Sequence, residues 1–221
     1  MPQVKLLCLH GAGTSIQILQ SQLAPLIREL QKDSTASFHF IEGEVECGPG
    51  PGIEGIFEGP YFSFYKWPRT LEDDDESLYD AYGYLSDVIE EEGPFDGVIG
   101  FSHGGTLAFG YLAHLAKTRP NDALPFRCAV FMNAPPPFRM DTYGNLIVEE
   151  GLQDLVRIPT LHVVGKKDFI YNFSLKLHEL CDSANSTLVL HEKGHEIPSD
   201  TKNVNRITKA LRELCQVSAF L

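Results

Sequence analysis

The 221-residue sequence has no long hydrophobic run and little positive charge. No stretch approaches the ~20 apolar residues of a membrane-spanning helix. The first apolar run, VKLLCLH, is too short for the core of an export signal. The 18 Lys and Arg residues are outnumbered by 30 Asp and Glu, which gives a formal net charge of −12. Because such a surface repels phosphate backbones and anionic lipid, we expect no nucleic-acid or membrane partner.

Cysteine is sparse and irregularly placed. The five cysteines are odd in number and have no C-x-x-C spacing, so they do not indicate a disulfide framework. Cys8 and Cys128 lie in apolar runs, where reduced cysteine packs as a small hydrophobe. We therefore expect a reduced, cytoplasmic setting. There is no internal repeat or low-complexity tract, and the length predicts a single domain over residues 1–221.

Short β-branched apolar runs alternate with longer helical patterns. We predict strands over residues 4–9, 37–41, 97–101, 128–132, 161–164 and 187–191, and helices over 16–31, 78–91, 103–117, 173–181 and 203–217. We expect Pro25 to kink or restart the first helix and Ser77 to cap the second. Continuous apolar strands are typical of parallel strands covered by helices on both faces. The sequence thus predicts an α/β fold with a mainly parallel sheet of about six strands.

Residues 43–76 do not fit this alternation. The segment is rich in Gly and Pro, carries six aromatic residues and ends in the acidic run EDDDE. A loop well beyond ~15 residues inside a compact domain is usually functional or disordered, and the aromatic content argues against disorder. We predict a lid or pocket wall in which Tyr61, Phe62, Phe64 and Trp67 contact substrate. The alternative is a packed excursion that only covers the sheet.

Residues 95–116 carry the strongest chemical signal. The run from Gly100 to Gly104 fits the G-x-S-x-G pattern, with a β-type run before it and a helix-forming run after it. Ser102 in a sharp strand-to-helix turn would expose its hydroxyl above the sheet, and the two glycines would relieve the crowding of that turn. We predict that Ser102 is a nucleophile; the alternative is an ordinary tight turn that carries a serine.

A nucleophilic serine needs a base and an acid that orients the base. With this pattern the chain order is Ser, then Asp or Glu, then His. Asp168 follows the strand predicted over 161–164, and His195 follows the strand predicted over 187–191. Asp154 precedes a strand and Asp182 ends a helix, so both are weaker candidates for the acid. We predict the catalytic triad Ser102, Asp168 and His195.

Residues 191–195, HEKGH, also fit the zinc motif H-E-x-x-H, which works only on a helix. The motif starts inside a β-type run and continues through Gly194 toward Pro198, and both residues are poor in a helix interior. We therefore predict a general base at His195, and neither a metal site nor a cofactor.

The glycine-rich run LHGAGTS, residues 9–15, follows the first predicted strand. We predict that the backbone N–H groups of His103 and Ala12 form an oxyanion hole, with Gly13 as the alternative to Ala12. We expect His10 to support this loop. A nucleotide site is disfavoured, because the run lacks the third glycine of a dinucleotide fingerprint and no P-loop lysine follows it.

With LHGAGTS, GPYFSFY, GPFDGVIGFSHGG and GHEIP present in that order, the chain resembles the fungal family of serine hydrolases (FSH), a branch of the α/β-hydrolases. The resemblance covers essentially the whole length and implies the triad Ser102, Asp168 and His195. Several fungal members resemble companions of polyketide synthases that release an acyl chain from a carrier protein. Members often carry Gln after the serine, whereas this chain has His103. A second imidazole beside the nucleophile would affect substrate fit or proton transfer.

We therefore expect a serine hydrolase that cleaves an ester or thioester of a sizeable apolar acyl group. The resemblance implies a polyketide on a carrier protein as one such substrate. One alternative is an acyltransferase or cyclase that uses the same acyl-enzyme. The other is a ligand-binding protein on a hydrolase fold, because fold does not guarantee activity. A carrier would need a basic rim, and the candidate cations are Lys66, Arg69, Arg139, Lys166 and Lys167. The alternative is that these five residues are ordinary surface cations with no role in docking.

Overall fold

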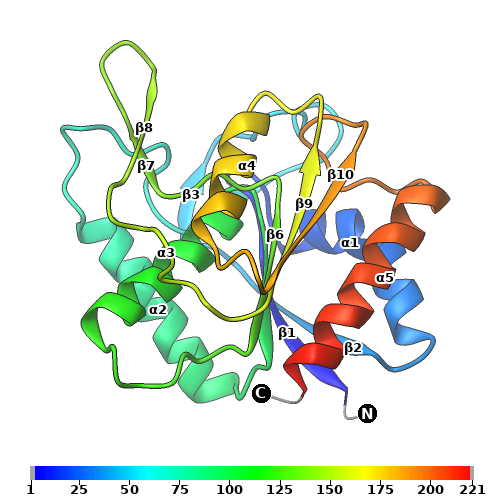
Figure 1. Cartoon of the computed structure of the whole chain (residues 1–221). Helices are drawn as coiled ribbons and strands as arrows, with labels where there is room; N and C mark the ends of the chain where they lie inside the picture. The colour runs from blue at the N-terminus through cyan, green and yellow to red at the C-terminus, as the bar shows by residue number, and fades with distance from the viewer. Residues whose placement is uncertain (1–2, 220–221) are drawn as a thin grey trace.

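The computed structural model describes residues 3–219 and is built around one six-stranded parallel sheet (Figure 1). The strand order across the sheet is β10-β9-β6-β5-β1-β2, and every neighbouring pair is parallel. The strands span Val4–Leu9 (β1), Ala36–Ile41 (β2), Gly97–Phe101 (β5), Cys128–Met132 (β6), Thr160–Gly165 (β9) and Ser186–His191 (β10). The predicted α/β fold and its six strands are confirmed.

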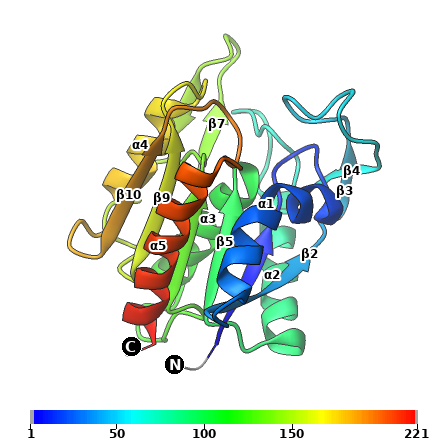
Figure 2. The ribbon, with the colours of Figure 1, turned by 90° about the vertical axis from the view of Figure 1, so that its right-hand side faces the viewer.

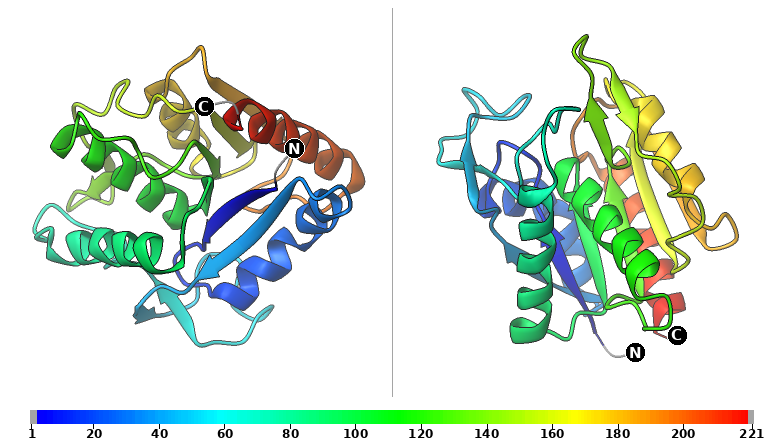
Figure 3. Two further views of the ribbon diagram at one scale, coloured as in Figure 1. Left: turned by 90° about the horizontal axis from the view of Figure 1, so that it is seen from below. Right: turned by 90° about the vertical axis from the view of Figure 1, so that its left-hand side faces the viewer.

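Helices cover both faces of the sheet. They span Ile16–Gln31 (α1), Glu76–Glu92 (α2), His103–Thr118 (α3), Tyr171–Leu180 (α4) and Thr201–Ser218 (α5). In Figure 2, α1 and α5 lie side by side on the face toward the viewer, and the right panel of Figure 3 shows α2, α3 and α4 on the other face. The sheet is therefore buried on both sides, as its continuous apolar strands predict.

Two hydrophobic cores follow from the period-2 geometry of the strands. Leu7 and Leu9 of β1 pack into the core under α2, α3 and α4, whereas Leu6 and Cys8 pack into the core under α1 and α5. All four side chains are 0% exposed. Strands β1, β2, β5 and β6 thus contribute apolar side chains to both cores, which explains why they lack polar alternation.

Two local expectations about the helices differ from the structure. Helix α1 continues through Pro25, so the chain does not restart there. Proline removes the hydrogen bond to the residue four positions earlier, which is Ser21; because Ser21 is exposed, water can replace that donor. Helix α2 begins after Asp75 rather than after Ser77, whose hydroxyl instead accepts a hydrogen bond from the backbone N–H of Lys66 at 3.0 Å.

Two short antiparallel hairpins lie beyond the carboxyl ends of the sheet strands. Within the 43–76 segment, Val45–Cys47 (β3) pairs with Tyr61–Ser63 (β4). Further along, Phe138–Met140 (β7) pairs with Leu146–Val148 (β8), and this second hairpin was not predicted. A bridge between Thr70 and Met140 joins the two segments. Among residues 3–219, no helix is long and apolar enough to cross a membrane.

Candidate active site

Ser102 lies in a strained turn between β5 and α3. Its backbone has φ 52° and ψ −119°, a conformation that non-glycine residues rarely adopt. A Cβ at Gly100 would lie 2.4 Å from the backbone of Gly105, and a Cβ at Gly104 would lie 2.4 Å from the carbonyl oxygen of Leu9. Both glycines are thus sterically required, as the sequence predicted, and the turn presents the Ser102 side chain at the carboxyl end of the sheet.

His195 lies between Ser102 and Asp168. Its Nε2 atom is 2.9 Å from the Ser102 hydroxyl oxygen, and its Nδ1 atom is 2.8 Å from Asp168 Oδ2. The three side chains come from loops that follow β5, β9 and β10, which are brought together by the parallel sheet. The structure therefore places the three residues chosen from the sequence in one hydrogen-bonded chain.

The carboxylate of Asp168 is enclosed, whereas the imidazole is partly open. The Asp168 side chain is 0% exposed, and the backbone N–H of Ile170 donates to its second oxygen at 3.0 Å. The His195 ring packs against Phe101 and Phe169, with ring centroids 5.1 and 4.8 Å away. A buried anion whose oxygens both accept hydrogen bonds is well suited to stabilise a proton on the neighbouring imidazole.

The other candidate acids lie elsewhere. Asp154 accepts a hydrogen bond from Gln153, and Asp182 caps a turn at Ala184 and Asn185. Neither carboxylate contacts His195 among the hydrogen bonds and ion pairs of residues 3–219.

The HEKGH segment is not helical. His191 is the last residue of β10, and residues 192–195 continue as a turn. The Nδ1 atom of His191 accepts the backbone N–H of Lys193 at 3.3 Å, so the two histidines do not share a helical face. Burial lowers the pKa of His191. Across the described part of the chain, no group of three or more His, Cys, Asp or Glu side chains is arranged to hold a metal ion.

Two backbone N–H groups close to Ser102 have no hydrogen-bond partner among the described residues. Within residues 3–219, the N–H groups of Ala12 and His103 make no hydrogen bond. By contrast, the N–H of Gly13 donates to the carbonyl of Phe62 at 3.0 Å. Of the two candidates in the glycine-rich loop, Ala12 is therefore the one with a free donor, and it lines the cavity beside Ser102.

The ring of His103 faces away from that cavity. Its Nε2 atom accepts the backbone N–H of Phe64 at 3.0 Å, and its ring packs against Tyr65 and Trp67 at centroid distances of 4.4 and 4.5 Å. The side chain is fully buried, which holds the pKa of His103 well below its usual range. A neutral His103 thus anchors the 43–76 segment to the start of α3 and lies outside the cavity beside Ser102.

His10 makes a similar connection from the glycine-rich loop. Its Nδ1 atom lies 2.8 Å from the carbonyl oxygen of Gly11, and its Nε2 atom accepts the backbone N–H of Gly43 at 2.9 Å. The ring also packs against Phe64, with centroids 4.6 Å apart. His10 therefore supports the loop as expected.

A cavity of about 500 Å³ opens beside Ser102 and His195. Its apolar walls come from residues 51–57, Trp67, the β7–β8 hairpin and the loop after β9. These apolar side chains are Ile53, Ile56, Phe57, Trp67, Phe138, Met140, Leu146, Phe169 and Ile170. A larger groove of about 660 Å³ lies between Arg119 and Pro159 and contains none of the triad residues.

Of the four aromatic residues predicted to contact substrate, Trp67 lines the cavity and the other three do not. Phe62 pairs through its backbone with Thr14. Phe64 is buried against the rings of His10 and His103. The Tyr61 hydroxyl donates to the carbonyl of Phe57 at 2.7 Å. These three residues thus lie outside the cavity lining, and within 51–57 the apolar surface comes from Ile53, Ile56 and Phe57.

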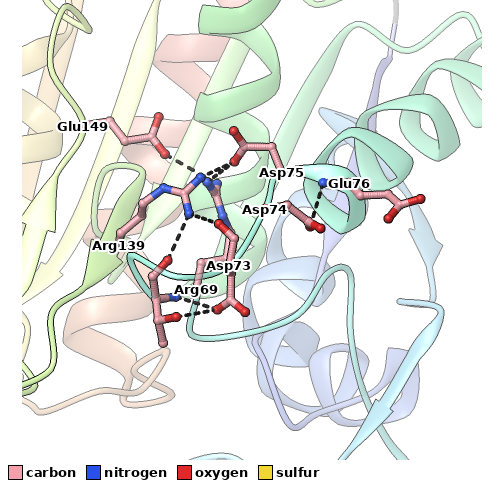
Figure 4. A network of polar contacts seen from close by, with 8 residues as sticks. Arg69, Asp73, Asp74, Asp75, Glu76, Arg139 and Glu149 are labelled. Carbon is pink, nitrogen blue, oxygen red and sulfur yellow. Dashed lines mark hydrogen bonds and ion pairs between the residues drawn. The ribbon is translucent and has the colours of Figure 1, made fainter.

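The predicted basic rim is also wrong in its main part. Figure 4 shows Arg69 and Arg139 converging on the carboxylate of Asp75. Arg69 is 5% exposed and also pairs with Glu149 at 3.4 Å. Lys66 pairs with Asp73, and Lys166 pairs with Glu192 at 2.6 Å. Four of the five cations are thus neutralised within the chain, and the arginines tie the 43–76 segment to the β7–β8 hairpin. Lys167 is exposed.

The chain is similar to known hydrolases over most of its length. Residues 1–207 match the family model described as serine hydrolase (FSH1). "Hydrolase phiM" of Talaromyces stipitatus is 45% identical, over 97% of this chain and 88% of that protein. "Esterase FPY3" of Fusarium mangiferae is 32% identical, over 88% of each chain. A Bacillus cereus carboxylesterase has a TM-score of 0.61 at 21% identity, covering 96% of this chain and 89% of that one. The chain therefore belongs to the serine hydrolase (FSH1) family.

Proposed function

We propose that this serine hydrolase cleaves a carboxylic ester or thioester of an apolar acyl group through an acyl-enzyme on Ser102. The observation that carries this proposal is the chain of two hydrogen bonds from Asp168 through His195 to Ser102, at the mouth of an apolar cavity. A serine without a catalytic role would need neither a strained backbone nor a histidine that is hydrogen-bonded to a buried carboxylate.

The reaction follows from the roles of the three side chains. His195 Nε2 accepts the Ser102 proton while the hydroxyl oxygen attacks the acyl carbonyl carbon. The tetrahedral intermediate collapses, the bond to the alcohol or thiol breaks, and the imidazolium donates its proton to that leaving group. Water then attacks the acyl-enzyme with His195 as base, which releases the acid and restores Ser102. Asp168 stabilises the imidazolium in both halves of the cycle.

The negative charge on the carbonyl oxygen needs donors that are in place beforehand. The N–H groups of Ala12 and His103 are suited to this role, because each lacks another partner within the described residues. Both belong to rigid segments, the loop held by His10 and the first turn of α3. Such preorganised donors typically contribute about 3 kcal/mol each to transition-state stability.

The cavity supports an apolar acyl group as the substrate class. Its volume of about 500 Å³ lies within the range of small-molecule sites, and its walls are mainly aliphatic and aromatic. An acyl chain or aromatic acyl group would bury apolar surface there and gain about 0.8 kcal/mol for each methylene. Because the cations near the cavity are mostly paired within the chain, we propose a free small-molecule ester or thioester rather than an acyl group presented by an acidic carrier protein.

The test is a panel of p-nitrophenyl esters and acyl-N-acetylcysteamine thioesters with acyl chains of increasing length. We expect kcat/KM to rise with chain length and to vanish in Ser102→Ala, which keeps the fold. Products are identified by mass spectrometry, which separates hydrolysis from acyl transfer to an added alcohol or amine. Full activity of Ser102→Ala would reject the proposal, and activity confined to a carrier-bound acyl group would reject the free-substrate part of it.

A further inference from the structure

Asn133 follows strand β6 and has an unusual backbone conformation. Its φ is 46°, in the left-handed region, where asparagine is tolerated better than most residues. The residue is 1% exposed, and its backbone N–H donates to the carbonyl of Val163 at 2.9 Å. The side chain is therefore held in one place beneath the active site, outside the cavity that Ser102 faces.

The amide of Asn133 joins two loops, which we call the acid loop (residues 165–170) and the base loop (residues 192–197). Its Oδ1 atom accepts the backbone N–H of Gly165 at 2.8 Å, and its Nδ2 atom donates to the carbonyl of Glu196 at 3.0 Å. One partner is a donor and the other an acceptor, so the orientation of the amide is fixed by the network.

Both contacts lie close in sequence to triad residues. The carbonyl of Gly165 accepts the N–H of Asp168 at 3.1 Å, which forms the turn that places the carboxylate. Glu196 directly follows His195, and its N–H donates to Gly194 at 2.9 Å. The two loops also touch each other, because a Cβ at Gly165 would lie 2.4 Å from the carbonyl oxygen of Gly194. A backbone hydrogen bond joins them as well, since the N–H of Lys167 donates to the carbonyl of Lys193 at 3.0 Å. The planar amide of Asn133 adds a side-chain bridge between the same two loops from the end of β6.

Met132, the residue before Asn133, contacts the segment that carries Ser102. The carbonyl of Met132, the last residue of β6, accepts the backbone N–H of Ser102 at 2.9 Å. The dipeptide Met132-Asn133 thus contacts the segments of the nucleophile, the acid and the base. No other part of the fold needs the side chain of Asn133, because the side-chain bonds it makes within the described residues are those two.

We propose that Asn133 is a positioning residue that holds the acid loop and the base loop at the separation the triad requires. The inference rests on the function proposed above and deepens it at the same site. Asn133 touches neither substrate nor reacting atoms; it acts through Asp168 and His195. Because productive geometry in a hydrogen-bonded triad is narrow, a shift of about 1 Å between acid and base lowers turnover far more than it lowers substrate binding.

The test is Asn133→Gly, which keeps the left-handed backbone accessible and removes both side-chain hydrogen bonds. We expect kcat to fall about 10²-fold with KM nearly unchanged, because the acyl cavity is untouched. The spectroscopic readout is the proton shared by His195 Nδ1 and Asp168, which resonates far downfield in the proton NMR spectrum. This signal should broaden or disappear in Asn133→Gly.

Thr208→Val is the matched control, since it removes a buried hydrogen bond to Val204 inside α5, away from the active site. It should lower stability while preserving kcat and the downfield signal. A kcat for Asn133→Gly within about threefold of wild type, with the signal intact, would overturn the proposal.

If Asn133→Gly does not fold, Asn133→Asp decides. It keeps an acceptor for Gly165 and removes the donor to Glu196, so kcat should still fall while KM holds; unchanged kcat would overturn the proposal. The outcome is separable from the proposed function: if Ser102→Ala abolishes hydrolysis but both Asn133 variants match wild type, only this inference fails. Activity that survives Ser102→Ala rejects the function itself.

Discussion

The buried imidazole of His103 should make the stability of the protein depend on pH. The ring is fully buried, accepts the Phe64 N–H and stays neutral because burial holds its pKa well below the usual range. In the unfolded chain the same imidazole takes up a proton near pH 6.5. Below about pH 6.5 the unfolded state therefore binds one more proton, and acidification lowers the free energy of unfolding until the pH reaches the folded-state pKa.

The magnitude follows from this linkage. Each such group costs about 1.4 kcal/mol per pH unit, so His103 alone accounts for about 2 kcal/mol between pH 6.5 and pH 5. Other buried histidines add to the acid sensitivity, since burial lowers the pKa of His162 to about 3. His103→Gln removes one proton-binding group, while the Gln amide oxygen remains available to accept the Phe64 N–H. The loss of stability on acidification should therefore be about 2 kcal/mol smaller in this variant than in wild type.

The assay is urea denaturation at pH 7.5 and pH 5, followed by tryptophan fluorescence. Trp67 is the single tryptophan, and its ring centroid lies 4.5 Å from that of His103, so it reports directly on this cluster. His39→Gln is the control, because it makes the same substitution at a partly exposed ring on β2, beside Glu92. Equal acid sensitivity of wild type and His103→Gln would refute the reasoning.

Three further predictions concern the acid, the cavity and the ion-pair network. Asp168→Asn should lower kcat about 10⁴-fold by favouring the wrong tautomer of the catalytic histidine; a steady-state rate near wild type would contradict this assignment. Trp67→Ala and Phe138→Ala should flatten the preference for longer acyl chains, which is roughly fourfold per methylene in kcat/KM; a preference that survives both would place the acyl group elsewhere. Asp75→Asn should cost about 1–3 kcal/mol in urea denaturation, because Arg69 is then left buried with Glu149 alone; unchanged stability would show that the network does not hold the hairpin.

The sheet and the hydrogen-bonded arrangement of Ser102, His195 and Asp168 could be predicted because their signals are local. Continuous apolar runs mark strands that are buried on both faces, and the G-x-S-x-G pattern marks a turn that only glycines at Gly100 and Gly104 permit. The order of Ser102, Asp168 and His195 along the chain follows from loops at the carboxyl ends of successive strands. These features depend on backbone geometry, and the positions of apolar residues and glycines in the sequence indicate that geometry directly.

The cavity walls could not be predicted in the same way. The sequence predicts that Phe62 and Phe64 contact substrate. In the structure Phe62 instead pairs with the glycine-rich loop, and Phe64 packs against the imidazole rings of His10 and His103. The wall is completed by Phe138 and Leu146 from a hairpin with strands of three residues, too short to show a period. A turn signal, Asp141 to Gly144, is the one local sign of that hairpin.

The charges near the cavity show the same limit. Arg69 and Arg139 stand 70 positions apart, and nothing in either neighbourhood indicates that both bind Asp75. Pairing of this kind depends on the tertiary contact between the 43–76 segment and the β7–β8 hairpin. Asn133 was missed for a related reason, since its role depends on two loops that meet only in the folded chain.

The central claim is that Ser102 is an activated nucleophile, and reaction with a fluorophosphonate tests it most directly. Intact-mass spectrometry of the folded protein should show one adduct per chain, and peptide mapping should place it on Ser102. Ser102→Ala should remain unlabelled, and His195→Ala should label far more slowly, because the hydroxyl then lacks its base. Absence of labelling in folded wild-type protein, or an adduct that persists in Ser102→Ala, would contradict the account.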